Sequence, residues 1–317
     1  DVSNIDSVGI ITARKGVRIT GGGLTVVGVS TFTDDINANG NIVGDDSTNI
    51  SGINTVAANF YFGCGGQGSR LFQNDSQGNL IAGTNAGLAI TIGNNHQANV
   101  LIGRCAGKSV AASCFNIMIG QNAGCCVTQS SGQQVLIGCG AGKKLGKEGG
   151  NNNGNTFLGH NAGGELINSE MNIAIGHDAG KGTEGCTGGS CNIAIGFRAG
   201  CDQKSSHNNN IFIGRLTGVA NSSGCDNIFM GDLAGNKNIS GGNNSAFGNF
   251  GLYANTTGGS NVALGPNAGR CNTTGSGNIF MGLGAGRCGV SGSCNVVIGN
   301  EAACDGFGNN SFNIAIG

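Results

Sequence analysis

The chain is poor in the residues that build an ordinary globular core. Its 317 residues include 1 Pro and no Trp, and charged residues make up 10%, against about 25% in typical soluble domains. Aromatic residues contribute only 5%, and the apolar residues are mostly Ile, Val, Ala and Leu spread evenly along the chain. This composition disfavours one thick core and favours many thin apolar layers.

Several classes of function lack their usual signals. The net charge is −1 and no run of like charges occurs, so we expect neither a nucleic-acid partner nor an anionic membrane surface. No apolar stretch approaches the roughly 18 residues that a membrane-spanning helix needs. We therefore expect no insertion into a membrane.

Catalytic and metal-binding patterns are also missing. The 14 cysteines contain no CxxC pair, which argues against a zinc site and against a redox dithiol. No nucleophile with a base and no paired carboxylates can be proposed from the spacing of the 4 histidines and 17 acidic residues. His160 and His177 share one position in the repeat and could stack, for which we favour a solvated surface pair over a metal site. We expect no enzyme and no cofactor.

Glycine is abundant instead, with 64 residues, and much of it belongs to an internal repeat. The stretch NVLIGRCAG at 99–107 returns as NIMIGQNAG at 116–124, NIAIGHDAG at 172–180 and NIFMGDLAG at 227–235. Seven of the twelve spacings between the central repeat glycines are 17 residues, and the additional residues of the others lie in the polar stretches. These glycines are Gly103, Gly120, Gly138, Gly159, Gly176, Gly196, Gly214, Gly231, Gly248, Gly265, Gly282, Gly299 and Gly317. A fixed period with insertions confined to loops predicts an all-β stack, a β-solenoid or β-prism with a period of about 17 residues.

One copy, VLIGRCAGKS at 100–109, looks like a phosphate-binding loop. Its glycines are one residue too close for GxxxxGK[ST], and the Lys108–Ser109 pair does not recur in the other copies. We therefore interpret it as one unit of the repeat.

Each repeat begins with Asn, continues as a short apolar strand and ends at glycine. In stacked strands about 4.8 Å apart, these asparagines would form a ladder of amide hydrogen bonds. The alternative is that each Asn only favours a turn. The candidate rungs are Asn116, Asn155, Asn172, Asn192, Asn227, Asn261 and Asn278.

The rest of each period, such as YANTTGGS at 253–260, is almost entirely polar. A single chain then offers one strand and one Ala per layer, which we do not expect to enclose a core. Three chains could close a slender prism and hide their strand edges, so we predict a parallel homotrimer. The alternative is a monomeric solenoid.

The chain divides by sequence into three parts. Residues 1–60 are predicted to form a β-rich shaft or connector, 61–98 an irregular entry, and 99–317 the regular repeat array. The segments GIITARKGVRIT and GGGLTVVGVSTF resemble repeats of structural and tail-fibre proteins of marine, cyanophage-like tailed bacteriophages. The NIAIGxxAG repeats and spacers such as NTTG at 272–275 resemble phage fibre shafts and the heads of trimeric autotransporter adhesins, whose usual period is shorter.

These resemblances imply an extracellular or virion-surface fibre made of copies of this chain. Its expected role is structural, presenting a rigid trimeric shaft for attachment to a host or to neighbouring cells through a surface glycan or receptor. The residues themselves leave an alternative open, a monomeric β-solenoid that binds or cleaves polysaccharide. An acidic cluster lining a groove would favour that alternative.

Most cysteines flank the polar loops. Disulfides are plausible across a loop, between Cys186 and Cys191 or Cys288 and Cys294, and between layers, from Cys271 to Cys288. Such bonds would need an oxidising environment. The alternative is a set of small buried thiols that fill corners of the layers.

Of the Asn-x-Ser/Thr sequons in the polar loops of the later repeats, four are candidates for glycosylation. If a glycosylating cell exports the chain, these asparagines could carry glycans. They are Asn221, Asn238, Asn255 and Asn272.

Overall fold

A computed structural model describes residues 73–74, 77–90, 97–128, 132–147, 152–184, 186–202, 204, 207–305 and 308–317. The chain divides into two compact units, Asp1–Thr55 and Val56–Gly317. The first unit, and with it the predicted shaft or connector at 1–60, lies outside the described residues. All described residues belong to the second unit.

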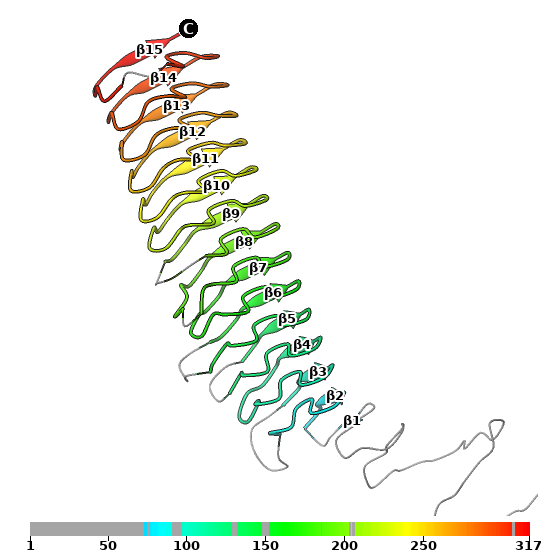
Figure 1. The fold of residues 1–317 in the computed structure, drawn as a ribbon. Coiled ribbons are helices and arrows are strands. Elements are labelled where there is room, and N and C mark those ends of the chain that lie inside the picture. The colour runs from blue at the N-terminus through cyan, green and yellow to red at the C-terminus, as the bar shows by residue number, and fades with distance from the viewer. Residues whose placement is uncertain are drawn as a thin grey trace, which may run out of the picture. The chain divides into compact units, whose positions relative to one another are not determined.

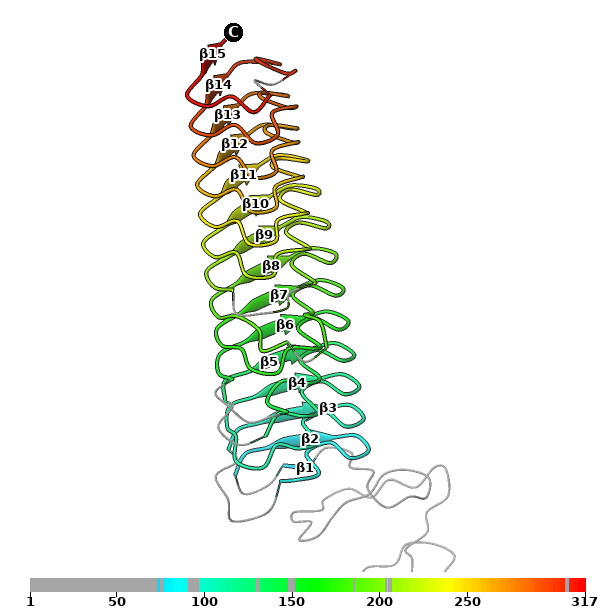
Figure 2. The same ribbon diagram turned by 60° about the vertical axis from the view of Figure 1, so that its left-hand side comes forward.

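The described chain forms a β-solenoid in which each turn contributes one short strand to a single sheet (Figures 1 and 2). The 15 strands lie in sequence order; β1 is antiparallel to β2, and every later pair is parallel. The strands are β1 Gln73–Asn74, β2 Leu80–Ala82, β3 Val100–Ile102, β4 Ile117–Ile119, β5 Val135–Ile137, β6 Thr156–Leu158, β7 Ile173–Ile175, β8 Ile193–Ile195, β9 Ile211–Ile213, β10 Ile228–Met230, β11 Ser245–Phe247, β12 Val262–Leu264, β13 Ile279–Met281, β14 Val296–Ile298 and β15 Ile314–Ile316. The predicted all-β stacked-repeat solenoid is confirmed. Within the described residues, no helix is long and apolar enough to cross a bilayer.

The glycine after each strand is required by the stacking of the layers. Gly103 has φ 123°, and a Cβ built on it would lie 2.7 Å from both the carbonyl carbon and the carbonyl oxygen of Gly120 in the next layer. Any larger residue would combine an unfavourable backbone conformation with a clash against backbone. This glycine therefore ends the strand and allows adjacent turns to approach closely.

The turns after the strands are also joined from layer to layer. The amide of Leu233 donates to the carbonyl of Arg215 in the preceding layer at 2.9 Å, and the amide of Gly235 donates to Gly251 in the following layer at 2.9 Å. Such bonds recur along the stack. Because turns and strands both bond to their neighbours, we expect each layer to be held rigidly between the two adjacent ones.

A single chain encloses its own core. The central residue of each strand points inward, and Leu101, Met118 and Phe229 are completely buried. The Ala of most repeats packs beside them, and further buried residues such as Val110 and Leu252 cover the remaining side. The prediction that one chain could not enclose a core is therefore wrong. It overlooked apolar residues that stand singly among polar ones, and buried asparagines that satisfy the polar groups of the loop.

The regular array begins earlier than residue 99. Residues 80–82 form β2, which pairs in parallel with β3 in the same register as the later strands. Gly83, with φ 119°, occupies the position of a repeat glycine. Part of the predicted irregular entry at 61–98 is thus a layer of the solenoid.

Candidate functional site

The outer face of the parallel sheet is apolar along the stack. The first and third residues of each strand point away from the core, whereas the second is buried. We call the outward residues of β3 to β15 the sheet face. Its first positions are Val100, Ile117, Val135, Thr156, Ile173, Ile193, Ile211, Ile228, Ser245, Val262, Ile279, Val296 and Ile314, and its third positions are Ile102, Ile119, Ile137, Leu158, Ile175, Ile195, Ile213, Met230, Phe247, Leu264, Met281, Ile298 and Ile316. Only Thr156 and Ser245 among them are polar, and none is charged.

Most side chains of the sheet face are half-buried, and nine of the 26 are exposed. The exposed fractions of Ile117, Leu158 and Phe247 are 38%, 43% and 39%. At about 4.8 Å per layer the face is about 60 Å long, and a strand of three residues makes it about 10 Å wide. Parallel sheets are usually covered on both faces, and soluble monomers rarely expose a contiguous apolar patch of this size. The sheet face is therefore suited to burial against another apolar surface.

Inside the solenoid, the asparagines that begin the repeats form a continuous ladder. The Asn227 side-chain amide donates to Asn210 Oδ1 at 3.1 Å and to the Gly241 carbonyl at 2.9 Å. Its Oδ1 accepts from the backbone and side-chain amides of Asn244, at 3.0 and 3.1 Å. One carboxamide thus satisfies two donors and two acceptors away from water, which neither a carboxylate nor an apolar residue could do.

All seven predicted rungs belong to this ladder: Asn116, Asn155, Asn172, Asn192, Asn227, Asn261 and Asn278. The prediction omitted equivalent residues whose position in the repeat is the same. They are Asn79, Asn99, Gln134, Asn210, Asn244, Asn295 and Asn313. The residue before many of these asparagines has positive φ, so a tight turn and a ladder occur together.

The sequon asparagines form a second buried ladder and do not lie on the surface. Asn221, Asn238, Asn255 and Asn272 are at most 1% exposed. The Asn238 amide donates to Asn221 Oδ1 at 2.7 Å and to the Gly241 carbonyl at 2.9 Å, and so has no hydrogen left to replace. A glycan on any of these four side chains is incompatible with the folded interior, which corrects the expectation that they could carry glycans.

The five cysteines proposed for disulfides carry free thiols in the structure. Cys186 is buried, Cys271 and Cys288 are half-buried, and Cys191 and Cys294 are exposed. Burial raises the pKa of the Cys186 thiol, which keeps it protonated and packed in the core. The proposed disulfides remain a prediction.

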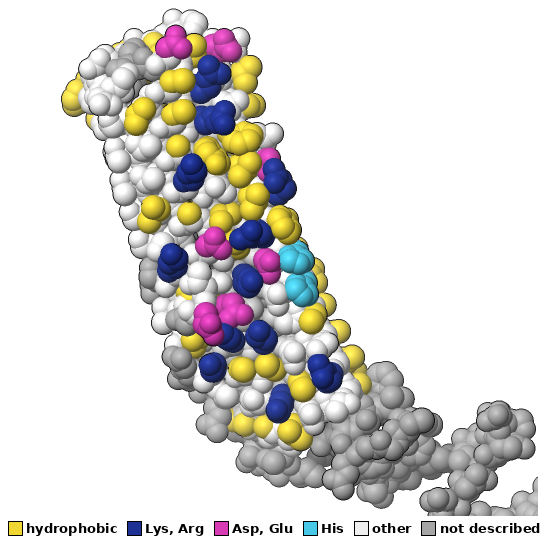
Figure 3. Space-filling model, in the orientation of Figure 1, with side chains coloured by type: hydrophobic (Ala, Val, Ile, Leu, Met, Phe, Trp, Pro, Cys, Tyr) yellow, Lys and Arg dark blue, Asp and Glu magenta, His cyan; other side chains and the backbone are white. Residues whose placement is uncertain are grey.

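Charged side chains gather on the face formed by the turns after the repeat glycines, which we call the turn face (Figure 3). A hollow of about 460 Å³ lies there, in layers lengthened by insertions. We call it the charged pocket, and it is lined by Lys144, Glu165, Asp178, Lys181, Gly182, Thr183, Glu184, Arg198, Cys201 and Asp202. Sequence reasoning missed it, because residues as far apart as Lys144 and Glu184 meet only through stacking.

The acids of the charged pocket are matched by cations. Lys144 Nζ lies 2.6 Å from Glu165 Oε2 and 3.0 Å from Glu184 Oε1. Burial acts to raise the pKa of Glu165, but hydrogen bonding to Lys144 and the charge of Lys143 outweigh it and lower the pKa below its ordinary value. Glu165 is therefore an ionised partner in an ion pair, the opposite of the raised pKa that a carboxylic general acid needs.

Two adjacent thiols lie near the same lysines. The sulfur atoms of Cys125 and Cys126 are 3.7 Å apart. The pKa of Cys126 is lowered to about 6, first by the hydrogen bond from the Cys125 thiol and then, against the opposing effect of burial, by Lys147, Lys143 and Lys144. The pKa of Cys125 is raised by the same hydrogen bond and by burial. Cys126 is therefore the more reactive thiol of the pair near neutral pH.

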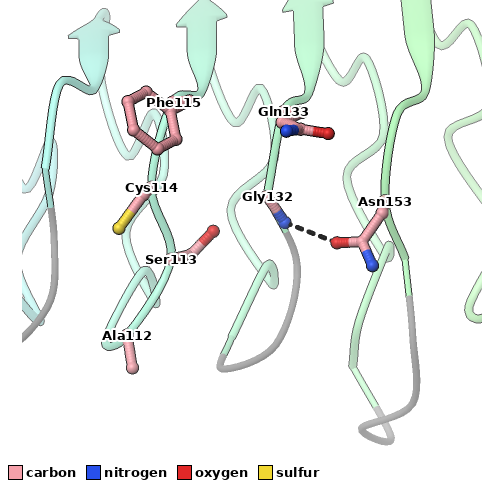
Figure 4. A pocket seen from close by; sticks show the side chains of 7 residues that line it. All are labelled: Ala112, Ser113, Cys114, Phe115, Gly132, Gln133 and Asn153. Atoms are coloured by element: carbon pink, nitrogen blue, oxygen red, sulfur yellow. Dashed lines mark hydrogen bonds between the residues drawn. The ribbon is translucent and has the colours of Figure 1, made fainter.

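A separate hollow of about 350 Å³ lies on the polar-loop side, below β4 to β6 (Figure 4). Phe115 stands at one end with 60% of its surface exposed. The Asn153 side chain accepts a hydrogen bond from the Gly132 amide at 2.8 Å at the other end. Gln133 also lines this hollow, so it combines an exposed ring with amide groups.

Comparison with known proteins finds no relative: no family model, no curated protein and no solved structure matches the chain. The features of the described chain that could carry a function are the sheet face, the charged pocket and the hollow beside Phe115.

Proposed function

We propose that this protein is a structural subunit of a fibre on the exterior of a virion or cell, and that it assembles with copies of itself through the sheet face. The observation that carries this proposal is the sheet face, a flat apolar strip without charge along thirteen consecutive strands. Burial of such a surface favours assembly by about 25 cal/mol per Å² of apolar area, against which the entropy lost on association must be set. A shaft built in this way would be rigid, because its layers are hydrogen-bonded in both strands and turns.

A second copy of the chain is the partner that matches the sheet face best. The partner must present an uncharged apolar strip of the same length, with side chains repeating at the layer spacing, and another copy has this by construction. The strip has a geometric area of about 600 Å² before flanking residues are added, comparable with the roughly 800 Å² per partner of stable interfaces. Three copies meeting along their sheet faces would give the parallel homotrimer expected from the sequence.

In such an assembly the turns and polar loops stay outside, where they are available for attachment. The hollow beside Phe115 is the best candidate for binding a surface glycan, because an exposed ring with Gln133 and Asn153 nearby offers both an apolar surface and polar groups to one sugar unit.

Polysaccharide cleavage is less well supported. The carboxylates of the charged pocket are compensated by Lys144, Lys181 and Arg198. Glycoside hydrolysis usually needs one carboxylic acid with a raised pKa and a second carboxylate across the bond, whereas the pKa of Glu165 is lowered. We therefore infer a structural role and not a catalytic one.

Assembly is tested by native mass measurement on the wild-type chain and on a variant with Ile173→Glu and Ile279→Glu. Both residues belong to the sheet face and are 37% exposed, so charge should disrupt association without entering the core. The matched control is Leu283→Glu, which changes an apolar residue 49% exposed outside the sheet face. We expect multimers for the wild type and the control, and a 31.4 kDa monomer for the double variant. A monomeric wild type at concentrations of about 100 μM would contradict the proposal.

Glycan binding is tested separately on a glycan array with Phe115→Ala. The matched control is Phe312→Ala, because Phe312 also precedes a ladder asparagine and is 82% exposed, but does not line the hollow. Loss of binding only in Phe115→Ala is expected. Equal binding by both variants would place glycan attachment elsewhere without affecting the assembly test.

A further inference from the structure

On the turn face, residues at the same repeat position stack in a column from layer to layer. One such column brings metal-ligating side chains together. The residue directly after the repeat glycine is His160 in one layer and His177 in the next. Their rings stack with centroids 4.7 Å apart and an interplanar angle of 26°. The side-by-side histidines are visible at the edge of the solenoid in Figure 3. Phe197, at the same position one layer further, packs against His177 with ring centroids 5.6 Å apart.

Asp178 is held beside this pair by the backbone. Its amide donates to the His160 carbonyl at 2.9 Å, and its φ is 54°. The side chain is only 16% exposed. Its Oδ2 lies 3.2 Å from His177 Nδ1, and its Oδ1 lies 3.7 Å from Lys181 Nζ and accepts no hydrogen bond. The carboxylate therefore turns one oxygen toward the histidines and the other toward the nearest cation.

We propose that His160, His177 and Asp178 bind one divalent transition-metal ion of the zinc class. One ligand atom from each residue lies within 4.8 Å of the other two. Two ligands of a tetrahedral Zn²⁺ ion at about 2.0–2.1 Å are about 3.3 Å apart, close to the 3.2 Å between His177 Nδ1 and Asp178 Oδ2. The His177 side chain is 53% exposed, so its ring has room to rotate and bring the imidazole nitrogens together.

The chemistry of the three ligands selects among metal ions. Two imidazoles and one carboxylate suit zinc, copper and nickel, whereas magnesium and calcium prefer sites made of oxygen atoms. The open side of the site faces solvent and leaves a fourth position for water. Lys181 and Arg198 lie close enough to affect Asp178 electrostatically and oppose a cation. We therefore expect moderate affinity, with a Kd in the micromolar range.

The ion would join the layers of β6 and β7, next to a break in the buried apolar core. Buried apolar residues separate into two clusters here, one ending at Ala179 and Cys186 and the other beginning at Ala194. The inward strand residues, Ala174 and Ala194, are the smallest that occur at this position. A metal held by His160 after β6 and His177 after β7 would tie together the last two layers of the first cluster, on the side of the solenoid away from the core. Binding to the folded state alone would raise its stability.

The test is equilibrium dialysis of the full chain against Zn²⁺ after alkylation of its thiols with iodoacetamide, combined with thermal unfolding in the presence and absence of Zn²⁺. All variants carry Cys139→Ser, because Cys139 occupies the same column position one layer before His160. We expect one Zn²⁺ per chain, an increase in the unfolding temperature, and Cu²⁺ spectra that report nitrogen ligands.

His160→Gln and His177→Gln should each weaken Zn²⁺ binding at least tenfold and abolish the thermal shift, and Asp178→Asn should weaken binding several-fold. The matched control, Asn249→Gln, changes the same column position in a distant layer and should bind as the parent does. His160, His177 and Asn249 are exposed, so variants at these positions should fold normally. The unfolding curve without metal checks this. No Zn²⁺ bound at 100 μM, or equal binding by the His160→Gln/His177→Gln double variant, would overturn the site.

Discussion

The earlier and later layers of the solenoid use opposite chemistry at one buried position. Seven residues after the repeat glycine, the earlier layers have Val110, Val127, Leu145 and Leu166, whereas the later layers have Asn221, Asn238, Asn255 and Asn272. Both sets are at most 3% exposed. The fold therefore accepts either an apolar column or an amide column, provided that each residue matches its neighbours above and below.

The two columns differ in how strictly they require a regular period. From Gly214 to Gly299, where the amide column lies, every spacing is 17 residues, but the layers of the apolar column include spacings of 18 and 21. A hydrogen-bonded column needs each amide at a fixed height and orientation. Apolar contact is not directional, so those layers tolerate insertions. The charged pocket lies in the tolerant part.

The largest expected effect comes from placing an amide in the apolar column. Leu145→Asn removes a completely buried side chain and introduces polar groups without partners. We expect a loss of about 4 kcal/mol in unfolding free energy, from lost burial and from unsatisfied hydrogen bonds. Urea unfolding measures it, with Leu145→Met as the volume-conserving control. A loss below about 1 kcal/mol would show that amides need no matching neighbours.

Placing an apolar residue in the amide column should lower the unfolding free energy by a smaller amount, because this change adds apolar burial. Asn238→Leu leaves Asn221 Oδ1 without its donor and the Asn255 amide without its acceptor. We expect a net loss of about 2 kcal/mol. Replacing all four of Asn221, Asn238, Asn255 and Asn272 by Leu should cost less per site, since no partner is stranded. Urea unfolding measures both variants. If the fourfold variant lost four times the unfolding free energy that Asn238→Leu loses, the requirement that neighbouring residues of the column match would be contradicted.

A smaller effect is expected at the charged pocket and depends on pH. Because the pKa of Glu165 is lower in the folded state than its ordinary value of about 4.3, its ion pair with Lys144 stabilises the fold above that value. The contribution is lost as pH falls through the lower, folded-state pKa. The wild type should lose up to about 1 kcal/mol more than Glu165→Gln on acidification. Parallel stability curves for the two proteins would contradict this.

The lowered pKa of Cys126 should affect the reactivity of this thiol, with almost no effect on the stability of the fold. With a pKa of about 6, Cys126 is mostly thiolate at pH 7, and should react with iodoacetamide several-fold faster than Cys225 or Cys271 in the later layers. Peptide mass mapping after brief labelling measures the rates. Cys125→Ala should slow Cys126, because it removes the hydrogen bond that lowers the Cys126 pKa. Equal rates at all three cysteines would contradict the lowered pKa.

The motif itself was readable from the sequence, and what lies between motifs was not. The regular spacing of three features predicts their structure directly. They are the apolar triplet, the repeat glycine and the asparagine of each layer. Val110 and Asn238 do not, because each stands alone among polar or small residues and is buried only when its neighbours stack. For the same reason the sequence predicts neither the burial of the sequon asparagines nor the core that a single chain encloses. The charged pocket depends on residues from several layers, which one period cannot reveal.

The close approach of repeat glycines has a consequence for how such a chain changes length. Each layer meets the next through the same backbone contact, as Gly231 meets Gly248 and Gly248 meets Gly265. Removing residues 232–248 would join two surfaces that already fit, and duplicating them would add one more layer. Slippage or recombination between repeats in the gene would therefore shorten or extend the rod in steps of about 4.8 Å, without a new fold having to arise.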